Sequence, residues 1–276
     1  MKIQPIISVL NAKGGVGKTT STVNIGAALA MSGAKVLLID VDLQANLTHS
    51  LIGDIPSGEP SIAEVMINEA GLEEIIRSTR TPNLFIAPAG ETLIGLDITL
   101  AGAMGREQIL KNCLKQTDSL SDFDVILIDN PPYISLATVN SLVSSTHYLI
   151  PVSCEYLPMV GIKLLNENVE KVRKKLNPDL KLLGVVLTMY DKRESITTQV
   201  EMLIREQLEE KVFKTPIRIN TKFKSTPIEQ QSIFQYEGDP SGRGSEDYEH
   251  LTHELVTRLQ EEGMLQIPTG RTVSNG

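Results

Sequence analysis

Short apolar runs alternate with longer amphipathic stretches along almost the whole chain. The apolar runs are rich in Val, Ile and Leu at successive positions, which is typical of strands buried on both faces of a parallel sheet. Strands are predicted over residues 3–10, 35–40, 84–87, 123–129, 148–152 and 181–189. Helices are predicted over residues 19–31, 62–68, 106–116, 159–176, 196–209 and 246–262. The alternation predicts an α/β fold in which a mostly parallel central β-sheet has helices on both faces.

The pattern continues to residue 262 without an internal repeat or a dividing linker. A single domain over residues 1–262 is therefore predicted. Residues 263–276 are mainly polar and contain Pro268 and Gly270, so they are expected to form a flexible tail.

The chain is acidic overall, with a net charge of −8, which argues against a general polyanion binder. Residues 171–225 are different, because they hold 13 Lys/Arg and 7 Asp/Glu. This basic region permits a nucleic-acid face, although solvated helix faces would give the same count. No apolar run approaches the ~20 residues that cross a bilayer. The start of the chain lacks an export leader, and Cys113 and Cys154 lack metal-ligand spacing, so a cytoplasmic protein is expected.

Residues 11–20 read Asn-Ala-Lys-Gly-Gly-Val-Gly-Lys-Thr-Thr and lie between the first predicted strand and the first predicted helix. This setting is typical of a phosphate-binding loop, in which backbone N–H groups and the helix N-terminus surround phosphate oxygens. Lys18 supplies a cation for the β- and γ-phosphates, and Thr19 supplies a hydroxyl for Mg²⁺. The predicted nucleotide contacts in this loop are Lys13, Gly14, Gly15, Val16, Gly17, Lys18, Thr19 and Thr20.

Ala12 stands where the general phosphate-loop pattern has glycine, and Lys13 adds a second lysine to the loop. Lys18 already fills the place beside the chain's own phosphates. Lys13 is therefore expected to reach the nucleotide of a second subunit, as arginine fingers do in trans. The alternative is a Gly/Lys-rich surface turn, which the flanking strand, helix and hydroxyls make improbable.

Residues 13–20 resemble the deviant Walker A motif of the ParA/MinD superfamily of P-loop ATPases, and the chain from about residue 3 to about residue 259 resembles its ParA/Soj branch. The resemblance implies a P-loop NTPase fold and an ATP hydrolase that uses ATP/ADP and Mg²⁺. It also implies a homodimer that forms with ATP and binds double-stranded nucleoid DNA without sequence preference. A ParB-like or cargo-adaptor protein would stimulate hydrolysis while a plasmid, chromosome or protein complex is positioned.

Asp40 and Asp42 follow the second predicted strand, and ligands bind at the carboxyl ends of strands in open α/β sheets. Their alternation at period 2 lets both face one side. The resemblance implies that Asp42 activates the attacking water and that Asp40 holds the hydration shell of the metal. Leu43 replaces the proline usual in Soj-like proteins. The alternative is a pair of solvated acids.

Asp129 ends another apolar strand and resembles the Walker B aspartate, which reaches Mg²⁺ through water. The switch turn, residues 130–132, would sense the γ-phosphate and is stiffened by its two prolines. The residue after Asp129 is usually Cys, Thr or Ala in the family, so an asparagine there is a departure. The predicted switch residues are Asn130, Pro131 and Pro132.

Two further sets of residues depend mainly on the resemblance. Met189 and Pro216 occupy the places that flank adenine in the family, although both positions also suit core residues. A nonspecific DNA face would contact phosphates through basic side chains, which need charge more than exact placement. Arg218 stands where relatives have a proline, one position before their arginine. The predicted DNA-binding residues are Arg193, Arg218, Lys222 and Lys224.

The alternatives are other positioning or electron-transfer proteins. A MinD/FlhG-like positioning ATPase or regulator acting without DNA shares the chemistry of Lys13. MinD itself needs a membrane-binding helix, and the C-terminal tail here lacks a basic amphipathic pattern, so no membrane partner is expected. An iron-protein-like electron carrier would need two cysteines suitably placed at a cluster, and a non-catalytic scaffold would not need Lys18, Asp42 and Asp129 together. The favoured location is the nucleoid in the cytoplasm.

Overall fold

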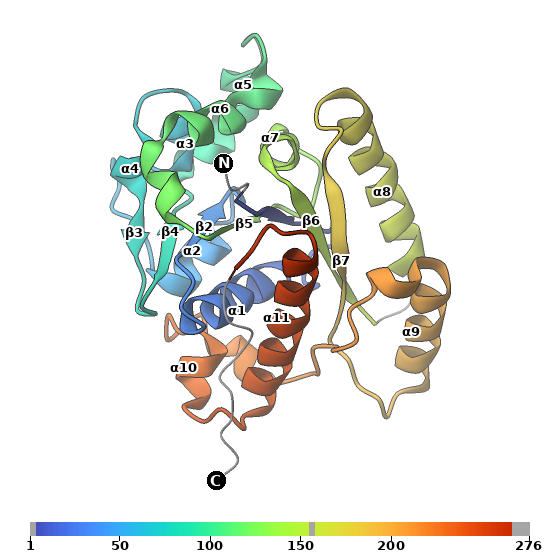
Figure 1. Cartoon of the computed structure of the whole chain (residues 1–276). Coiled ribbons are helices and arrows are strands. Elements are labelled where there is room, and N and C mark those ends of the chain that lie inside the picture. Colours follow the sequence, from blue (N-terminus) through green and yellow to red (C-terminus); the bar gives the residue numbers. More distant parts are fainter. Residues whose placement is uncertain (1–3, 155–157, 267–276) are drawn as a thin grey trace.

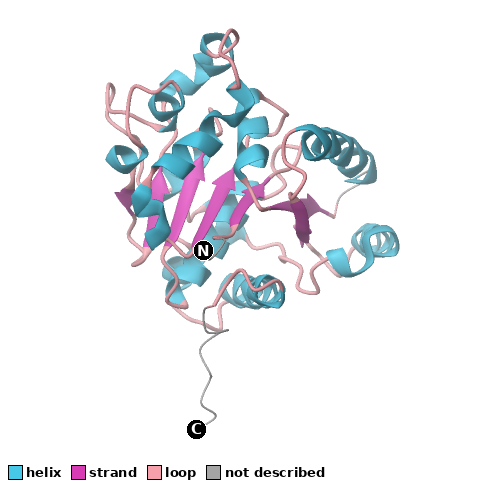
Figure 2. Ribbon diagram, turned by 45° about the horizontal axis from the view of Figure 1, so that its top comes forward, coloured by secondary structure: helices cyan, strands magenta, loops and turns pink. Residues whose placement is uncertain are grey.

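The computed structural model of the chain describes residues 4–154 and 158–266, which form one seven-stranded sheet with helices on both sides (Figures 1 and 2). The strand order is β3-β4-β2-β5-β1-β6-β7, and every neighbouring pair is parallel except β3 with β4. The predicted α/β fold is therefore confirmed. The strands are β1 (Ile6–Val9), β2 (Val36–Asp40), β3 (Arg77–Ser78), β4 (Leu84–Ala87), β5 (Val125–Asp129), β6 (His147–Ser153) and β7 (Lys181–Thr188).

Helices connect the strands and cover both faces. The four longest are α11 and α8, followed by α1 and α9, which are equal in length. The helices are α1 (Lys18–Met31), α2 (Asn46–Leu51), α3 (Ile62–Met66), α4 (Leu72–Ile75), α5 (Leu96–Thr99), α6 (Ile109–Gln116), α7 (Leu136–Ser144), α8 (Pro158–Lys175), α9 (Ser195–Leu208), α10 (Ile233–Glu237) and α11 (Arg243–Glu261).

Alternate side chains of the central strands enter two different cores. Leu38 and Leu127 pack into the core that contains α1 and α11, which lie side by side in Figure 1. Leu37 and Ile126 point to the opposite face, into the core of α3 and α6. A strand projects successive side chains to opposite faces, so the near-continuous apolar runs serve both cores. A third core lies between β6, β7, α8 and α9.

The pairing register gathers three strand ends at one place. Asp129 at the end of β5 lies opposite Val9 of β1 on one side and Asp40 of β2 on the other. The segments that leave these three ends are the phosphate loop, the switch turn and the loop that contains Asp42. The predicted chemistry therefore meets at the carboxyl edge of the sheet.

Several short elements differ from the sequence prediction. The predicted helix 106–116 is a 3₁₀ turn (Arg106–Gln108) followed by α6, and β1 is shorter than the predicted strand 3–10, of which residue 3 lies outside the described residues. The prediction missed α2, α4, α5, α7, α10 and β3. Most of these have six or fewer residues, so they lack the two or three turns over which periodicity can be recognised.

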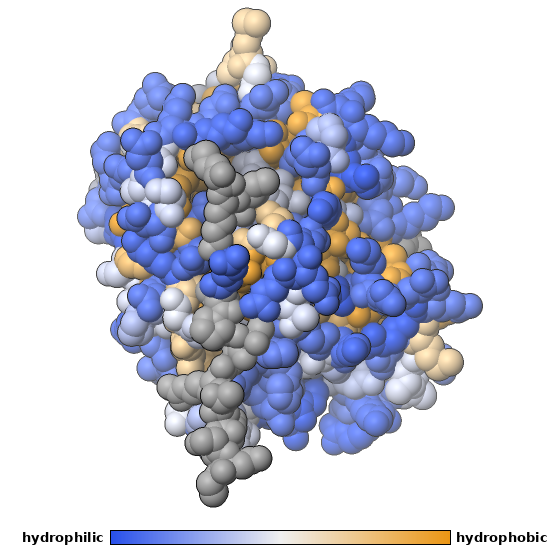
Figure 3. All heavy atoms as spheres, viewed as in Figure 1, coloured by the Kyte–Doolittle hydropathy of each residue, from blue (hydrophilic) through white to orange (hydrophobic). Residues whose placement is uncertain are grey.

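The packed chain extends beyond the predicted domain boundary at residue 262. Leu265 is 1% exposed and belongs to the core around α1 and α11, while the backbone N–H of Met264 donates to the carbonyl of Leu259. The rest of the predicted tail, residues 267–276, lies outside the described residues. None of the described helices has the length and apolar character needed to cross a membrane. The face shown in Figure 3 is mainly hydrophilic, with scattered apolar residues.

Candidate functional site

The phosphate loop runs from β1 into α1, as the sequence predicted. Gly15 and Gly17 have φ angles of 71° and 83°, in the left-handed region that favours glycine. Lys18 folds back over the loop, where its Nζ donates to the carbonyl oxygen of Lys13 at 3.1 Å. Burial lowers the pKa of Lys18 from its ordinary value, while nearby Asp129 and Asp42 favour the charged form. The loop therefore places an ammonium among backbone N–H groups, which is an arrangement that suits phosphate.

Thr19 and Asp129 form the second part of the site. The hydroxyl of Thr19 donates to Asp129 Oδ2 at 2.6 Å, and Thr22 approaches the other carboxylate oxygen at 3.4 Å. Burial raises the pKa of Asp129 to about 8, and the neighbouring carboxyl of Asp40 adds to the rise. A buried carboxyl beside a hydroxyl is a good match for a hard cation, whose charge would favour the ionised form.

The described residues contain no group of three or more His, Cys, Asp or Glu side chains that could hold a metal ion on their own. Mg²⁺ is usually held by one or two protein oxygens together with phosphates and water. The hydroxyl of Thr19 and the carboxyl of Asp129 offer two such oxygens, and their binding of Mg²⁺ stays a prediction.

Asp40 and Asp42 have different surroundings. Asp42 is 4% exposed and lines the cavity, and its Oδ1 accepts from the backbone N–H of Gln44 at 3.0 Å. Asp40 is fully buried and accepts three hydrogen bonds: from the backbone N–H of Asp42 at 3.1 Å, and from the N–H and hydroxyl of Thr48 at 2.9 and 2.8 Å. Burial raises the pKa of Asp40 to about 7. Of the two carboxylates only Asp42 lines the cavity, and the role of Asp40 in holding the hydration shell of the metal stays a prediction.

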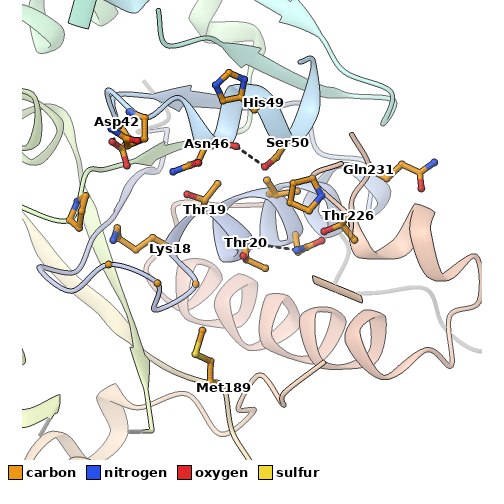
Figure 4. A pocket seen from close by; sticks show the side chains of 18 residues that line it. Lys18, Thr19, Thr20, Asp42, Asn46, His49, Ser50, Met189, Thr226 and Gln231 are labelled. Atoms are coloured by element: carbon orange, nitrogen blue, oxygen red, sulfur yellow. Dashed lines mark hydrogen bonds between the residues drawn. The ribbon is translucent and has the colours of Figure 1, made fainter. Parts of the chain in front are cut away.

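A cavity of about 400 Å³ opens from the phosphate loop along α1. Figure 4 shows Lys18 and Thr19 facing Asp42 and Asn46, with Thr226 and Gln231 at the far end and Met189 across from α2. This volume lies within the range of pockets that hold drug-sized ligands. The lining residues are Gly14, Gly15, Gly17, Lys18, Thr19, Thr20, Val23, Asn24, Asp42, Gln44, Asn46, His49, Ser50, Pro132, Met189, Thr226, Pro227 and Gln231.

The cavity includes most of the predicted nucleotide-binding residues but not all of them. Met189 lines it with a left-handed φ of 50°, whereas Pro216 and Val16 are not among the lining residues. Val16 is buried, and its carbonyl accepts a hydrogen bond from the hydroxyl of Thr188 at 2.9 Å. Lys13 is exposed in the loop, and its backbone N–H donates to Asn11 Oδ1 at 2.9 Å.

Sequence reasoning missed the wall formed by α2 and by residues 226–231. Asn46 and Ser50 are four positions apart on α2, so they share a helix face, and this spacing after Asp42 was the available signal. Nothing local marked Thr226 or Gln231, because a contact between distant segments leaves no short-range pattern. Among the switch residues, Pro132 lines the cavity and Pro131 is buried.

Three of the four predicted DNA-binding residues form ion pairs within the chain. Arg193 pairs with Asp191 at 2.6 Å and Lys222 pairs with Glu237 at 3.2 Å. Arg218 pairs with Glu246 at 2.5 Å and with Asp247 at 2.6 Å. Lys224 is exposed. A parallel bridge between Tyr190 and Arg218 brings the two predicted basic segments together, and DNA binding by these four residues stays a prediction.

Comparisons with known proteins show which family the chain is similar to. The AAA domain family model (AAA_31) matches residues 4–182. The chain is 39% identical to the sporulation initiation inhibitor protein Soj of Bacillus subtilis, over 91% of this chain and 98% of that protein. It is 34% identical to the chromosome partitioning protein ParA of Caulobacter vibrioides, over 92% of this chain and 94% of that protein.

A similar solved structure is that of cobyrinic acid a,c-diamide synthase from Mycobacterium smegmatis with bound ADP and magnesium. It superposes with a TM-score of 0.81 and 30% sequence identity, over 98% of this chain and all of that one.

Proposed function

The chain belongs to the ParA/Soj family of P-loop ATPases, and we propose that it is a Mg²⁺- and ATP-dependent dimerising ATPase that positions or segregates a cargo on DNA. The observation that supports this most is the meeting of Lys18, Thr19 and Asp42 around one cavity, with Asp129 bonded to Thr19. These groups come from three separate strand ends, and together they supply a phosphate cradle, a metal site and a base.

Each residue has a defined role in ATP hydrolysis. Lys18 and the backbone N–H groups of residues 14–20 would hold the phosphates, while Thr19 and Asp129 would hold Mg²⁺. When bound, Mg²⁺ would supply charge neutralisation on the phosphate oxygens. Asp42 orients the attacking water and accepts its proton. Asp40 holds Thr48 and the N–H of Asp42, so it positions the loop that contains the base.

Lys13 provides the link to a second subunit. Lys18 already lies across its own loop and bonds to the Lys13 carbonyl, and the side chain of Lys13 is exposed. Two subunits that meet at this edge of the sheet would each place Lys13 near the phosphates of the other. Dimerisation would then depend on the triphosphate. The phosphate charge would offset the cost of desolvating Lys13, and the ammonium of Lys13 would offset the repulsion between the two nucleotides.

The dimer would bind nucleoid DNA in the cytoplasm through basic residues of both chains, and a ParB-like or cargo-adaptor protein would stimulate hydrolysis. Support comes from the chromosome-partitioning relative of Caulobacter vibrioides and from the basic region over residues 171–225. DNA phosphates would have to compete with Asp191 and Glu237 for Arg193 and Lys222.

A second candidate is a MinD/FlhG-like positioning ATPase or regulator that acts without DNA. The ion pairs of Arg193, Arg218 and Lys222 favour it, since paired cations attract phosphate less strongly. DNA retention by the ATP-bound protein distinguishes the two candidates.

An amide-forming activity is not proposed for this chain. Thiol nucleophiles are activated by a lowered pKa. Burial raises the pKa of Cys154 to about 12 and also raises the pKa of Cys113. Neither described cysteine therefore has the lowered pKa that activates a thiol.

The proposed function is tested by Lys13→Ala, with Lys18→Ala and Lys115→Ala as controls. We expect Lys18→Ala to abolish nucleotide binding, because the cradle loses its cation. Lys13→Ala should bind nucleotide normally but form no ATP-dependent dimer and hydrolyse little ATP. Lys115→Ala, an exposed lysine on α6, should behave as wild type. Light scattering with a slowly hydrolysed ATP analogue measures the dimer, and dimers of normal mass in Lys13→Ala would contradict the cross-subunit role.

A further inference from the structure

Asn130 joins the ends of two central strands through its side chain. It is fully buried, and its Nδ2 donates to the carbonyl oxygens of Val9 at 3.1 Å and Ile128 at 3.0 Å. Val9 is the last residue of β1, and the phosphate loop follows directly. The first residue of the switch turn is therefore bonded to the strand that leads into the phosphate loop.

The turn reaches the cavity from this anchor. Pro131 is buried, and Pro132 lines the cavity. A Cβ atom built on Gly14 would lie 4.0 Å from Cβ of Pro132, so the turn lies beside the phosphate loop. Any displacement of Asn130 from β1 would thus move the wall beside the phosphate loop.

The oxygen of the same carboxamide, unlike its nitrogen, has no hydrogen-bond partner among the described residues. No described protein group donates a hydrogen bond to Asn130 Oδ1, although the atom is buried. A buried acceptor without a donor opposes the gain from the two N–H bonds. The net stabilisation of the turn is therefore modest, which keeps a second arrangement of the turn accessible.

We propose that Asn130 is a positioning residue that orders the switch turn before nucleotide binds and thereby favours ATP over ADP. If the turn is already ordered in the free protein, ordering it does not reduce the affinity for the nucleotide. ATP gains from this because its γ-phosphate contacts the turn, whereas ADP does not reach it. The inference rests on the proposed function, in which residues 130–132 sense the γ-phosphate.

The test compares Asn130→Ala with Asn177→Ala. Asn177 is a matched control, because its Nδ2 also donates to two backbone carbonyls, those of Leu142 and Ser145, away from the cavity. One lost neutral hydrogen bond corresponds to roughly a fivefold change in an equilibrium. In nucleotide-free Asn130→Ala we expect amide hydrogen exchange of residues 133–135 to be roughly fivefold to tenfold faster. The dissociation constant of a non-hydrolysable ATP analogue should rise by a similar factor, with that of ADP within about twofold.

The control should change neither exchange in the turn nor the preference for ATP. Unchanged exchange in Asn130→Ala would overturn the anchoring role. Faster exchange with equal losses of ATP and ADP affinity would overturn the discrimination. If Asn130→Ala does not fold, Asn130→Thr retains one donor and should give the same changes at smaller size. The proposed function fails separately, if wild-type protein shows no extra protection of the turn with the ATP analogue relative to ADP.

Discussion

Two aspartates that stand two positions apart contact different groups in this site. Asp40 ends β2 and accepts bonds from Thr48 and from the backbone of Asp42, whereas Asp42 lies beyond the strand and faces the cavity. The alternation of side chains applies only within a strand, so period 2 could not place Asp42. At the residue scale, the sequence identifies the chemical groups but not which of two like groups lines the cavity.

We expect Asp42→Ala to keep nucleotide binding and to lower the rate of ATP hydrolysis by about 10²- to 10⁴-fold, because the water loses its base. The ATP-bound dimer of this variant should persist. Asp40→Ala is the comparison: it should lower the free energy of unfolding by about 1–3 kcal/mol, since Thr48 would lose its buried acceptor. Single-turnover hydrolysis and urea unfolding measure the two effects. Wild-type turnover in Asp42→Ala would exclude its role as the base.

The sequence predicted some of the elements that line the cavity and missed others. The strand–loop–helix unit of the phosphate loop was predicted because its residue types and its setting agree. The wall formed by α2 and residues 226–231 was not predicted. Helix α2 has only six residues, and residues 226–231 contribute through a tertiary contact, which leaves no local pattern. Arg80 holds this second segment: its Nη1 donates to the carbonyl of Glu229 at 2.7 Å and its Nη2 to Gln230 Oε1 at 3.3 Å.

Replacing Arg80 by Ala should loosen residues 225–231 while leaving the phosphate loop intact. Gln230 has a φ of 51°, an uncommon conformation for a residue other than glycine, so it depends on its surroundings. We expect faster amide exchange in this segment and a loss of about 1 kcal/mol in the free energy of unfolding, because the contacts are exposed. Arg77→Ala is the control, since Arg77 lies close by and pairs with Glu59. Equal exchange in the two variants would refute the role of Arg80.

For the whole molecule, the α/β class, the parallel sheet and the main helices were predicted, because apolar runs buried on both faces have a distinct pattern. The ion pairs of the basic residues could not be predicted. Asp191 lies two residues from Arg193, but Glu237 lies fifteen residues from Lys222, and only the folded chain joins Arg218 to Asp247. A count of charges gives the net value of a region without showing which charges are already neutralised.

Replacing both Arg193 and Lys222 by Glu should weaken DNA binding by the ATP-bound protein at moderate salt. Each lost phosphate contact lowers the slope of log affinity against log salt by about 0.9. Lys115→Glu, on α6, is the control, because it changes the net charge by the same amount as each of the two replacements. Titration of a labelled duplex at several salt concentrations gives the slope. An unchanged slope in the double variant would remove these residues from the DNA face.

The packing of α11 on α1 affects how the protein is made. The hydroxyls of Tyr248 on α11 and Ser21 on α1 lie 3.2 Å apart. The preceding helix α10 also contacts α1, because the backbone N–H of Ile233 donates to Asn24 Oδ1 at 2.8 Å. A ribosome makes α1 near the start of synthesis and α11 near its end, with a delay of roughly 10–50 s at 5–20 residues per second. During that interval the apolar side of α1 lacks its partner helix. Nascent chains that stop early would therefore expose the apolar side of α1. Chaperones that bind growing polypeptides should recognise α1 before the chain leaves the ribosome.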